Sequence, residues 1–410
     1  MANQQKHPRS FHVVVKPLGS ACNLKCTYCY YEYKGTSGRI ADELLEKFIR
    51  QYIEGNEDEP VTFNWHGGEP TLLGLDFFRN VIAVQQKYAN GKRIENDFQT
   101  NGVLLDEAWC EFFKQHDFLV GLSIDGPKHL HDRFRMSSGS DSYFDQVYRA
   151  GQLLRRYGVR FTPLTVINRL NAQHPAEVYR FLTRDLGSQS VQWLPGVGHK
   201  DFEATAPGYW DPARMPVLGT PAARPGTPES VVTEWSVDPD DWGEFLCQTF
   251  AIWYREDLGK VIVNWFESSV AQWMGRPAFI CALAPLCGRS LVTMEKDGSL
   301  YSCDHFVYPE YRLGNLSDEG FRLADVVYGP QQQQFGYNKQ NSLPEYCRQC
   351  KYKFACNGEC PKNRFLRAPD GQPGLNYLCQ GNRRYFQYAE PFLRRIAARL
   401  QGSGTVDARA

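Results

Sequence analysis

The sequence predicts an α/β protein in which a parallel sheet curls into a partial barrel of six β–α units, followed by a cysteine-rich region. In the first half of the 410-residue chain, short apolar runs typical of strands alternate with amphipathic runs typical of helices. The length exceeds that of one average domain and leaves room for a second region. That region is marked by cysteines, because eight of the 13 lie between Cys281 and Cys379.

Each predicted strand is a short run rich in β-branched or aromatic residues, and each predicted helix has apolar residues three or four positions apart. We expect strands at residues 11–17, 61–65, 94–99, 118–124, 159–167 and 191–194. We expect helices from Ala41 or Asp42 onward and at residues 75–88, 106–116, 143–157 and 175–183. In such barrels the chemistry lies in the loops that follow the carboxyl ends of the strands.

The same patterns suggest where the domains begin and end. Residues 1–235 are expected to form the barrel, 236–280 a helical bridge, 281–395 the cysteine-rich domain and 396–410 a flexible tail. Residues 198–240 interrupt the pattern with many proline and glycine residues. Loops of this length tend to be functional or mobile, so this one is expected to be either a substrate lid or a surface insertion.

Charge and hydropathy exclude two classes of partner. The chain has 46 basic and 46 acidic residues, so it offers no net attraction to nucleic acid or to an anionic membrane. Residues 1–7 lack the apolar core of a signal peptide, and no apolar stretch is long enough to span a bilayer. We therefore expect a cytoplasmic protein without a nucleic-acid or membrane partner.

In a reducing compartment, metal ligation explains 13 cysteines better than disulfides do. Eleven of them fall into motifs. The other two, Cys110 and Cys247, stand alone in helical segments and are expected to be small buried apolar residues.

The first motif is C-x₃-C-x₂-C, formed by Cys22, Cys26 and Cys29. Three thiolates can bind three irons of a four-iron cluster and leave the fourth iron open to a substrate or cofactor. The alternatives are three unrelated buried thiols or a zinc site, for which His12 is the only nearby fourth ligand. With Tyr28 before the last cysteine, the motif resembles the signature of the radical S-adenosylmethionine (SAM) enzymes.

A second motif, Gly67-Gly68-Glu69-Pro70, follows the second predicted strand. A glycine pair at a strand end lets the backbone approach a ligand closely. In the radical SAM family the matching segment contacts the methionyl amino group, whereas His66 departs from the Gln expected in some relatives. The resemblance implies SAM contacts for Tyr28, Gly67, Gly68, Ser123, Arg135 and, near the adenine, Leu194.

The eight later cysteines supply two sets of four ligands, and their spacing resembles the SPASM extension of radical SAM enzymes. The resemblance implies a first set formed by Cys281, Cys287, Cys303 and Cys360. It implies a second set formed by Cys347, Cys350, Cys356 and Cys379. Spacing alone would also allow two zinc sites, but the resemblance implies two auxiliary [4Fe–4S] clusters, and therefore three clusters in all.

Asp304 directly follows Cys303 among aromatic residues, where burial is expected to raise its pKa as a general base requires. The run Cys-Asp-His-Phe-Val-Tyr-Pro-Glu at 303–310 resembles anaerobic sulfatase-maturating enzymes, as do the Phe63-x-Trp65-x-Gly-Gly-Glu-Pro-Thr-Leu-Leu-Gly and Gln99-Thr-Asn-Gly segments. The similarity extends from about residue 11 to residue 390, except for the 198–240 loop. In that family the Asp matching Asp304 deprotonates the substrate side chain.

The resemblance implies an oxidase that converts a Cys or Ser of a sulfatase polypeptide to Cα-formylglycine (3-oxoalanine) under anaerobic conditions. It would draw electrons from a reductant such as flavodoxin or ferredoxin. The main alternative is a radical SAM/SPASM maturase that crosslinks or otherwise modifies a short ribosomal peptide, since it would share every cluster motif. A non-enzymatic electron carrier is the third hypothesis.

Overall fold

The computed structural model describes residues 10–31, 38–57, 59–136, 141–288 and 291–402. Residues 1–7, for which the sequence predicts no signal peptide, lie outside these ranges. The chain divides into two compact units, which we describe separately. The first unit contains residues 1–123, 135–161 and 287–337, and the second contains residues 124–134, 162–286 and 338–410.

The first unit is built on a mixed sheet in which four parallel strands come from the predicted β–α units. These are β1 (Val13–Lys16), β3 (Val61–Trp65), β4 (Ile94–Thr100) and β5 (Leu119–Ser123). A strand that the sequence analysis did not expect, β10 (Val292–Glu295), pairs in parallel with the free side of β1. It continues antiparallel into β11 (Ser299–Tyr301) and β12 (Arg312–Asn315). The residue after Cys303 lies within reach of the side chain of Lys16, the last residue of β1.

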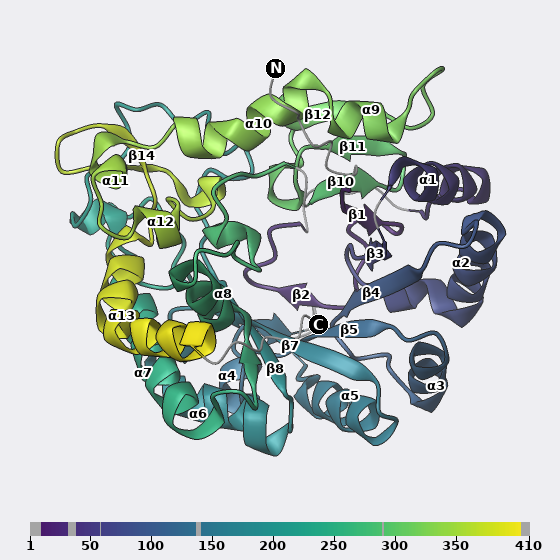
Figure 1. The fold of residues 1–410 in the computed structure, drawn as a ribbon, viewed down its shortest axis with the longest axis horizontal. Helices are drawn as coiled ribbons and strands as arrows, with labels where there is room; N and C mark the ends of the chain where they lie inside the picture. The colour runs from purple at the N-terminus through teal and green to yellow at the C-terminus, as the bar shows by residue number, and fades with distance from the viewer. Residues whose placement is uncertain (1–9, 32–37, 58, 137–140, 289–290, 403–410) are drawn as a thin grey trace. The chain divides into compact units, whose positions relative to one another are not determined.

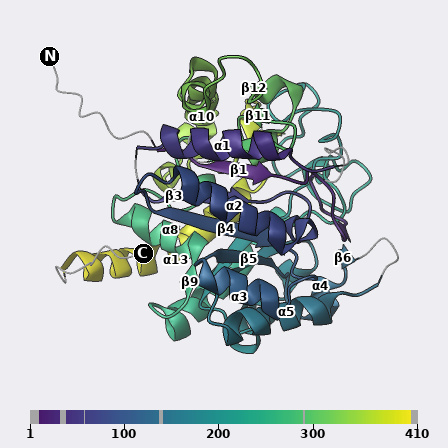
Figure 2. The same cartoon turned by 90° about the vertical axis from the view of Figure 1, so that its right-hand side faces the viewer.

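Four helices cover the outer face of these strands (Figures 1 and 2). They are α1 (Asp42–Gly55), α2 (Gly74–Tyr88), α3 (Glu107–Gln115) and α5 (Phe144–Arg156). Asp106 caps α3 by accepting a hydrogen bond from the backbone N–H of Trp109, 3.0 Å away. Aromatic rings join helices to sheet: the ring of Phe98 on β4 lies 4.9 Å from that of Phe78 and 5.0 Å from that of Phe113. Such pairs add about 0.5–1.5 kcal/mol each beyond the burial of their area.

The second unit contains the remaining parallel strands and a layer of helices. Its strands are β7 (Arg160–Ile167), which begins at the unit boundary, β8 (Ser190–Pro195) and β9 (Ile262–Val263). Its main helices are α6 (Pro175–Arg180), α7 (Pro239–Ile252), α8 (Asn264–Trp273) and α13 (Cys379–Gly402). Helices α7 and α13 lie side by side (Figure 1) and meet at two glycines. A Cβ on Gly381 would lie 2.1 Å from the carbonyl oxygen of Pro239, so this contact excludes any side chain.

The remaining α-helices and strands of the described residues connect these elements. They are β2 (Lys25–Cys26), α4 (Lys128–His131), β6 (Arg135–Met136), α9 (Leu323–Val327), α10 (Pro330–Asn341), α11 (Glu345–Arg348), α12 (Lys353–Cys356), β13 (Leu366–Arg367) and β14 (Pro373–Leu375). Within the described residues, no helix is long and apolar enough to cross a membrane.

The bridge expected at 236–280 contains two helices, since α7 passes into a π-helical turn and β9 separates it from α8. The tail expected from residue 396 is still helical as far as Gly402, since Ile396 and Ala397 are buried against the rest of the second unit. Residues 403–410 lie outside the described ranges.

The loop at 198–240 is anchored to the segment that follows Cys360. The backbone N–H of Arg367 donates to the carbonyl of Pro216 at 2.8 Å, and Leu218 N–H donates back to the carbonyl of Arg367 at 3.0 Å. The ring of His199 lies 5.0 Å from that of Phe365. These contacts make the loop an integral part of the second unit.

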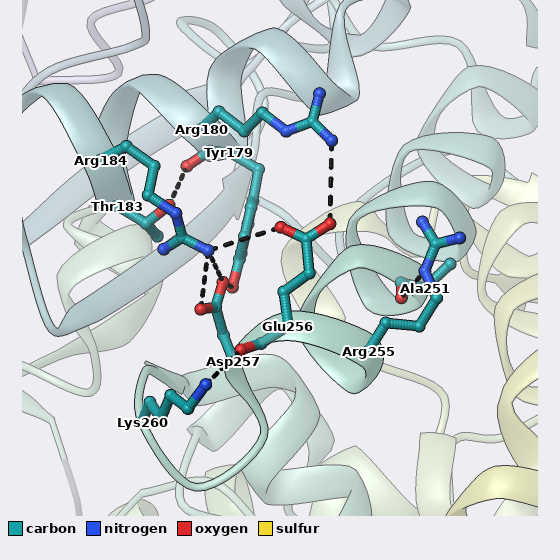
Figure 3. Close-up of polar contacts among 9 residues, drawn as sticks. All are labelled: Tyr179, Arg180, Thr183, Arg184, Ala251, Arg255, Glu256, Asp257 and Lys260. Carbon is teal, nitrogen blue, oxygen red and sulfur yellow. Dashed lines mark hydrogen bonds and ion pairs between the residues drawn. The ribbon is translucent and has the colours of Figure 1, made fainter.

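A buried carboxylate joins α6 to α7 through the π-helical turns that follow them, Phe181–Asp185 and Trp253–Asp257 (Figure 3). Asp257 is 3% exposed. It accepts hydrogen bonds from the Arg184 guanidinium at 2.7 and 2.8 Å and from the Tyr179 hydroxyl at 2.8 Å. Without Arg184, this carboxylate would keep its buried position with one side-chain donor fewer.

We expect Arg184→Met to lower the free energy of unfolding by about 1–3 kcal/mol, because it leaves a buried charge without its cation. Denaturant unfolding followed by circular dichroism measures this change. The matched control is Arg180→Met, which removes a 3.8 Å contact to Glu256 between exposed side chains and should cost less than about 1 kcal/mol. Equal losses of unfolding free energy in the two variants would contradict the assignment of Arg184 as the cation that stabilises the buried Asp257.

Candidate active site

The three cysteines of the first motif lie in the loop that follows β1. Cys26 belongs to β2, which pairs with β6 so that Cys26 stands opposite Arg135. The backbone N–H of Cys29 donates to the carbonyl of Cys26 at 2.9 Å. Burial raises the pKa of the Cys22 thiol to about 12, and the nearby Glu69, Cys26 and Cys29 add to the rise. Three thiolates this close repel one another unless a cation offsets their charge, so the loop fits a cationic iron cluster.

The two glycines of the Gly-Gly-Glu-Pro segment are required by close packing on this loop. Gly67 has φ +129°, in the region that favours glycine. A Cβ on Gly68 would lie 2.0 Å from the carbonyl oxygen of Ala21. The N–H of Gly68 donates to the carbonyl of Gly19 at 2.8 Å. The segment expected to bind the SAM amino group is therefore pressed against the cysteine loop.

The other predicted SAM contacts fall in both units. The guanidinium of Arg135, 7% exposed, lies 5.2 Å from the centre of the Tyr28 ring. Ser123 ends β5, where its hydroxyl accepts a hydrogen bond from Gln99 at 2.9 Å. Leu194 lies on β8 of the second unit. Tyr28, Gly67, Gly68, Ser123 and Arg135 all belong to the first unit, as do the three cysteines.

Asp304 lies at the end of β1, in an ion pair that the sequence analysis missed. The Lys16 ammonium, 0% exposed, lies 2.6 Å from Asp304 Oδ1. The Tyr30 hydroxyl donates to Oδ2 of the same carboxylate. Burial, with the nearby Asp304 charge, raises the pKa of Tyr30, so this hydroxyl stays a donor.

The expected rise in the pKa of Asp304 is wrong. Burial would raise it, as predicted, but nearby positive charge, chiefly that of the Lys16 ammonium, holds it well below its usual range. The carboxylate is therefore ionised at neutral pH.

A second set of side chains surrounds Lys16. Its ammonium lies 3.5 Å from the centre of the Tyr31 ring, and the Tyr31 hydroxyl donates to Glu295. Lys16 and Glu295 are direct neighbours in the β1–β10 pairing. The available sequence signal was a lysine inside an otherwise apolar strand followed, after the cysteine loop, by two tyrosines. Nothing in the local sequence pattern indicated that Lys16 would pair with Asp304, a residue 288 positions away.

His66 is a neutral ring beside this group. Its Nδ1 accepts a hydrogen bond from the N–H of Gly67 at 2.8 Å, and burial lowers its pKa. The ring orients the Gly67 peptide, so the structure gives His66 at least a role in shaping the glycine segment.

The second auxiliary set of cysteines surrounds a cavity within the second unit. Cys347, Cys350, Cys356 and Cys379 all line it, together with Tyr352 and Phe386. Burial raises the pKa of the Cys356 thiol to about 12, with a further contribution from Cys347. Burial also raises the pKa of Cys379, and the three neighbouring thiols add to it. Four cysteines around one cavity, whose thiolate forms would repel one another without a cation, fit a cationic cluster.

The first auxiliary set is divided between the units. Cys287 and Cys303 belong to the first unit, and Cys281 and Cys360 to the second. Lys339 fixes the backbone at Cys281, donating to its carbonyl at 2.7 Å. All 13 cysteines are free thiols, and Cys110 and Cys247 are buried as predicted.

Among the residues that the structure describes, no three His, Cys, Asp or Glu side chains are arranged to share a single metal ion. A cubane cluster does not require that arrangement, because its four ligands bind different iron atoms and so stand farther apart than the ligands of one ion.

Two domain families match the chain. Residues 17–182 match the radical SAM superfamily, and residues 286–351 match SPASM, an iron–sulfur cluster-binding domain. The first range holds the cysteine loop and the glycine segment, and the second holds Cys287, Cys303, Cys347 and Cys350. The fold is thus a radical SAM partial barrel with a SPASM domain.

Similarity to individual proteins extends over nearly the whole chain. A serine-type anaerobic sulfatase-maturating enzyme of Bacteroides thetaiotaomicron is 41% identical over 94% of this chain and 91% of its own length. A cysteine-type enzyme of Clostridium perfringens is 31% identical over 95% of this chain and 99% of its own length. The solved structure of native anSMEcpe with bound AdoMet (SAM) and the Cp18Cys peptide aligns with a TM-score of 0.79 at 30% identity, covering 96% of this chain and 100% of that one. The chain shares this similarity over its cysteine loop, its glycine segment and the segment of Asp304, and it belongs to the family of anaerobic sulfatase-maturating enzymes.

Proposed function

We propose that this protein oxidises a Cys or Ser of a sulfatase polypeptide to Cα-formylglycine under anaerobic conditions. The observation that carries the proposal is the ionised, partly buried carboxylate of Asp304, which pairs with the buried Lys16 beside a proposed ligand cysteine, in the same unit as the loops proposed to bind SAM. Oxidation of a serine CH₂–OH to an aldehyde removes one Cβ hydrogen atom, one hydroxyl proton and one further electron. The chain provides a place for each of the three.

The cofactors that we propose are SAM and three [4Fe–4S] clusters. Cys22, Cys26 and Cys29 would hold the SAM-binding cluster. The first auxiliary cluster would be held by Cys281, Cys287, Cys303 and Cys360, and the second by Cys347, Cys350, Cys356 and Cys379. When bound, SAM and its reduced cluster supply a 5′-deoxyadenosyl radical that takes the Cβ hydrogen atom, and the auxiliary clusters supply an electron acceptor.

Asp304 is the proposed acceptor of the hydroxyl or thiol proton. A carboxylate with a low pKa is a weak base toward an intact alcohol. After the Cβ hydrogen has left, the carboxylate is a strong enough base, because a carbon radical greatly acidifies the hydroxyl or thiol attached to it. Lys16 and Tyr30 keep the carboxylate ionised and oriented until that moment.

The proposed SAM contacts have separate tasks. The Gly67–Gly68 backbone would hold the amino group, and Arg135 with Ser123 would hold the carboxylate and ribose. Tyr28 would support Arg135 through its ring, and Leu194 would lie near the adenine. The domains are proposed to be those given by the sequence, with the barrel at 1–235, a bridge at 236–280 and the SPASM region at 281–395.

The proposed reaction needs a polypeptide substrate and a source of electrons, so it implies two protein partners. We propose a sulfatase polypeptide as substrate and a flavodoxin- or ferredoxin-type protein as reductant. We propose a cytoplasmic location, because the eleven proposed ligand cysteines must remain reduced. The equal numbers of basic and acidic residues give no reason to propose a nucleic-acid or membrane partner.

A reconstituted enzyme incubated anaerobically with SAM, a reductant and sulfatase peptides tests this function. Two peptides that differ only in Ser or Cys at the target position should be compared by mass spectrometry. Aldehyde formation in at least one supports the proposal. SAM cleavage with both peptides unmodified would contradict it, and a crosslinked product would favour the peptide-maturase alternative.

We expect Asp304→Asn to abolish aldehyde formation while SAM cleavage continues, because the amide cannot accept the proton and the radical steps precede that transfer. Chromatography of 5′-deoxyadenosine and mass spectrometry of the peptide measure the two outcomes separately. Asp297→Asn is the matched control, since Asp297 lies in the turn between β10 and β11 and accepts from Ser299 at 2.9 Å. Normal product from Asp304→Asn would remove this residue from the mechanism.

We expect Cys22→Ala to lose SAM cleavage and to retain about two thirds of the iron, because only one of three clusters loses a ligand. Iron analysis and 5′-deoxyadenosine formation after anaerobic reconstitution check this. Cys110→Ala, a buried thiol outside the proposed ligand sets, should keep both. If the two variants lose the same amount of iron, the ligand assignment of Cys22 is wrong.

A further inference from the structure

The side chain of Asn101 reaches the first ligand of the proposed SAM-binding cluster. Asn101 belongs to the Gln99-Thr-Asn-Gly segment after β4 and is 8% exposed. Its Nδ2 lies 3.7 Å from Cys22 Sγ and donates to Asn23 Oδ1 at 2.7 Å. The two N–H groups of one amide can serve both partners. The backbone N–H of Leu24 also donates to Cys22 Sγ, at 3.4 Å.

The orientation of the amide is set by its other contacts. Asn101 Oδ1 accepts a hydrogen bond from the N–H of Val103 at 3.0 Å, so the oxygen is turned away from the cysteine loop. The NH₂ group is therefore the end that faces Cys22. A reversed amide would lose the Val103 bond and place its oxygen against the Asn23 oxygen and the Cys22 sulfur.

A buried carboxylate fixes the backbone of Asn101. Glu69, 0% exposed, accepts the N–H of Asn101 at 2.7 Å and the Thr100 hydroxyl at 2.8 Å. The Glu69 oxygen that accepts from Thr100 also accepts from the N–H and the hydroxyl of Thr71, at 3.0 and 2.6 Å. The N–H of Glu69 donates to the carbonyl of Ala21 at 2.9 Å. Glu69 thus joins the glycine segment, the cysteine loop and the Asn101 segment into one rigid group.

We propose that Asn101 is a positioning residue that sets the reduction potential of the SAM-binding cluster through an N–H···S hydrogen bond to Cys22. A donor to a ligand sulfur withdraws electron density from the cluster and stabilises its reduced state, so it raises the potential. Glu69 keeps the donor in place. The inference rests on the proposed assignment of the cluster to Cys22, Cys26 and Cys29.

The test compares wild-type holoenzyme with Asn101→Leu and Asn101→Asp. Leucine is close in shape and lacks the donor, whereas aspartate keeps the Val103 acceptor and turns an anionic oxygen toward Cys22. Thr71→Val is the matched control, because it removes one hydroxyl from Glu69 and leaves the Asn101 amide intact. The midpoint potential is measured by redox titration with electron paramagnetic resonance, and the signal that changes on addition of SAM identifies the cluster.

For Asn101→Leu at the wild-type midpoint, we expect the ratio of reduced to oxidised cluster to fall about three- to tenfold. For a one-electron couple this is a shift of about 30–60 mV to more negative potential. Asn101→Asp should shift further in the same direction, and Thr71→Val should change the ratio less than about twofold. Iron content should equal that of wild type in all three.

Unchanged potentials in both Asn101 variants, with full iron content, would overturn the inference. Loss of iron from both would also overturn it, because it would assign Asn101 to cluster retention. A failure of the cluster assignment would look different, because the wild-type protein itself would show no SAM-sensitive cluster signal. A failure of the proposed sulfatase oxidation would appear only in the peptide assay, as SAM cleavage without aldehyde, and would leave the potentials of the variants unaffected.

Discussion

The active-site half of the molecule depends on the ion pair between the buried Lys16 and the partly buried Asp304. Loss of the Asp304 charge would leave the Lys16 ammonium buried and unpaired, a situation that costs about 3–5 kcal/mol in buried pairs. The pair therefore joins β1 firmly to the segment after Cys303, which the β1–β10 pairing has already brought close. It also settles the charge state of Asp304, since the ammonium holds its pKa low where burial alone would raise it. One contact thus determines both the position and the chemistry of the proposed proton acceptor.

The cysteine loop also depends on contacts with distant segments. Its thiolates would repel one another, and neighbouring segments fix its backbone. Gly68 allows the glycine segment to lie against Ala21, and Glu69 and Asn101 secure that contact by hydrogen bonds. The loop, the glycine segment and the Asn101 segment each follow a different strand of one sheet. The sheet therefore places at one edge the segments that would hold the cluster and bind the amino group of SAM, and the ion pair with Lys16 holds Asp304 in the same unit.

Much of this was predictable from local sequence. The strand expected at 61–65 coincides with β3, and the one expected at 191–194 lies within β8. The cluster loop and glycine segment were readable because their spacing is short and their chemistry distinctive. Lys16, Tyr30 and Glu295 were not, because their role arises when β10 pairs with β1, a contact between distant parts of the chain. A four-residue strand inside a cysteine-rich region gives too short a pattern to predict such pairing. The pKa of Asp304 was expected to rise, whereas it falls, because the local sequence does not show that Lys16 lies beside this carboxylate.

The central claim is a two-electron oxidation in which one Cβ hydrogen is removed for each aldehyde formed. A sulfatase peptide with deuterium at Cβ of the target residue tests it most directly, in an anaerobic reaction in which 5′-deoxyadenosine and aldehyde are quantified together by mass spectrometry. The account predicts one deuterium in each 5′-deoxyadenosine and one aldehyde per 5′-deoxyadenosine. Deuterium-free 5′-deoxyadenosine, or deuterium transfer that yields a product other than the aldehyde, would contradict it.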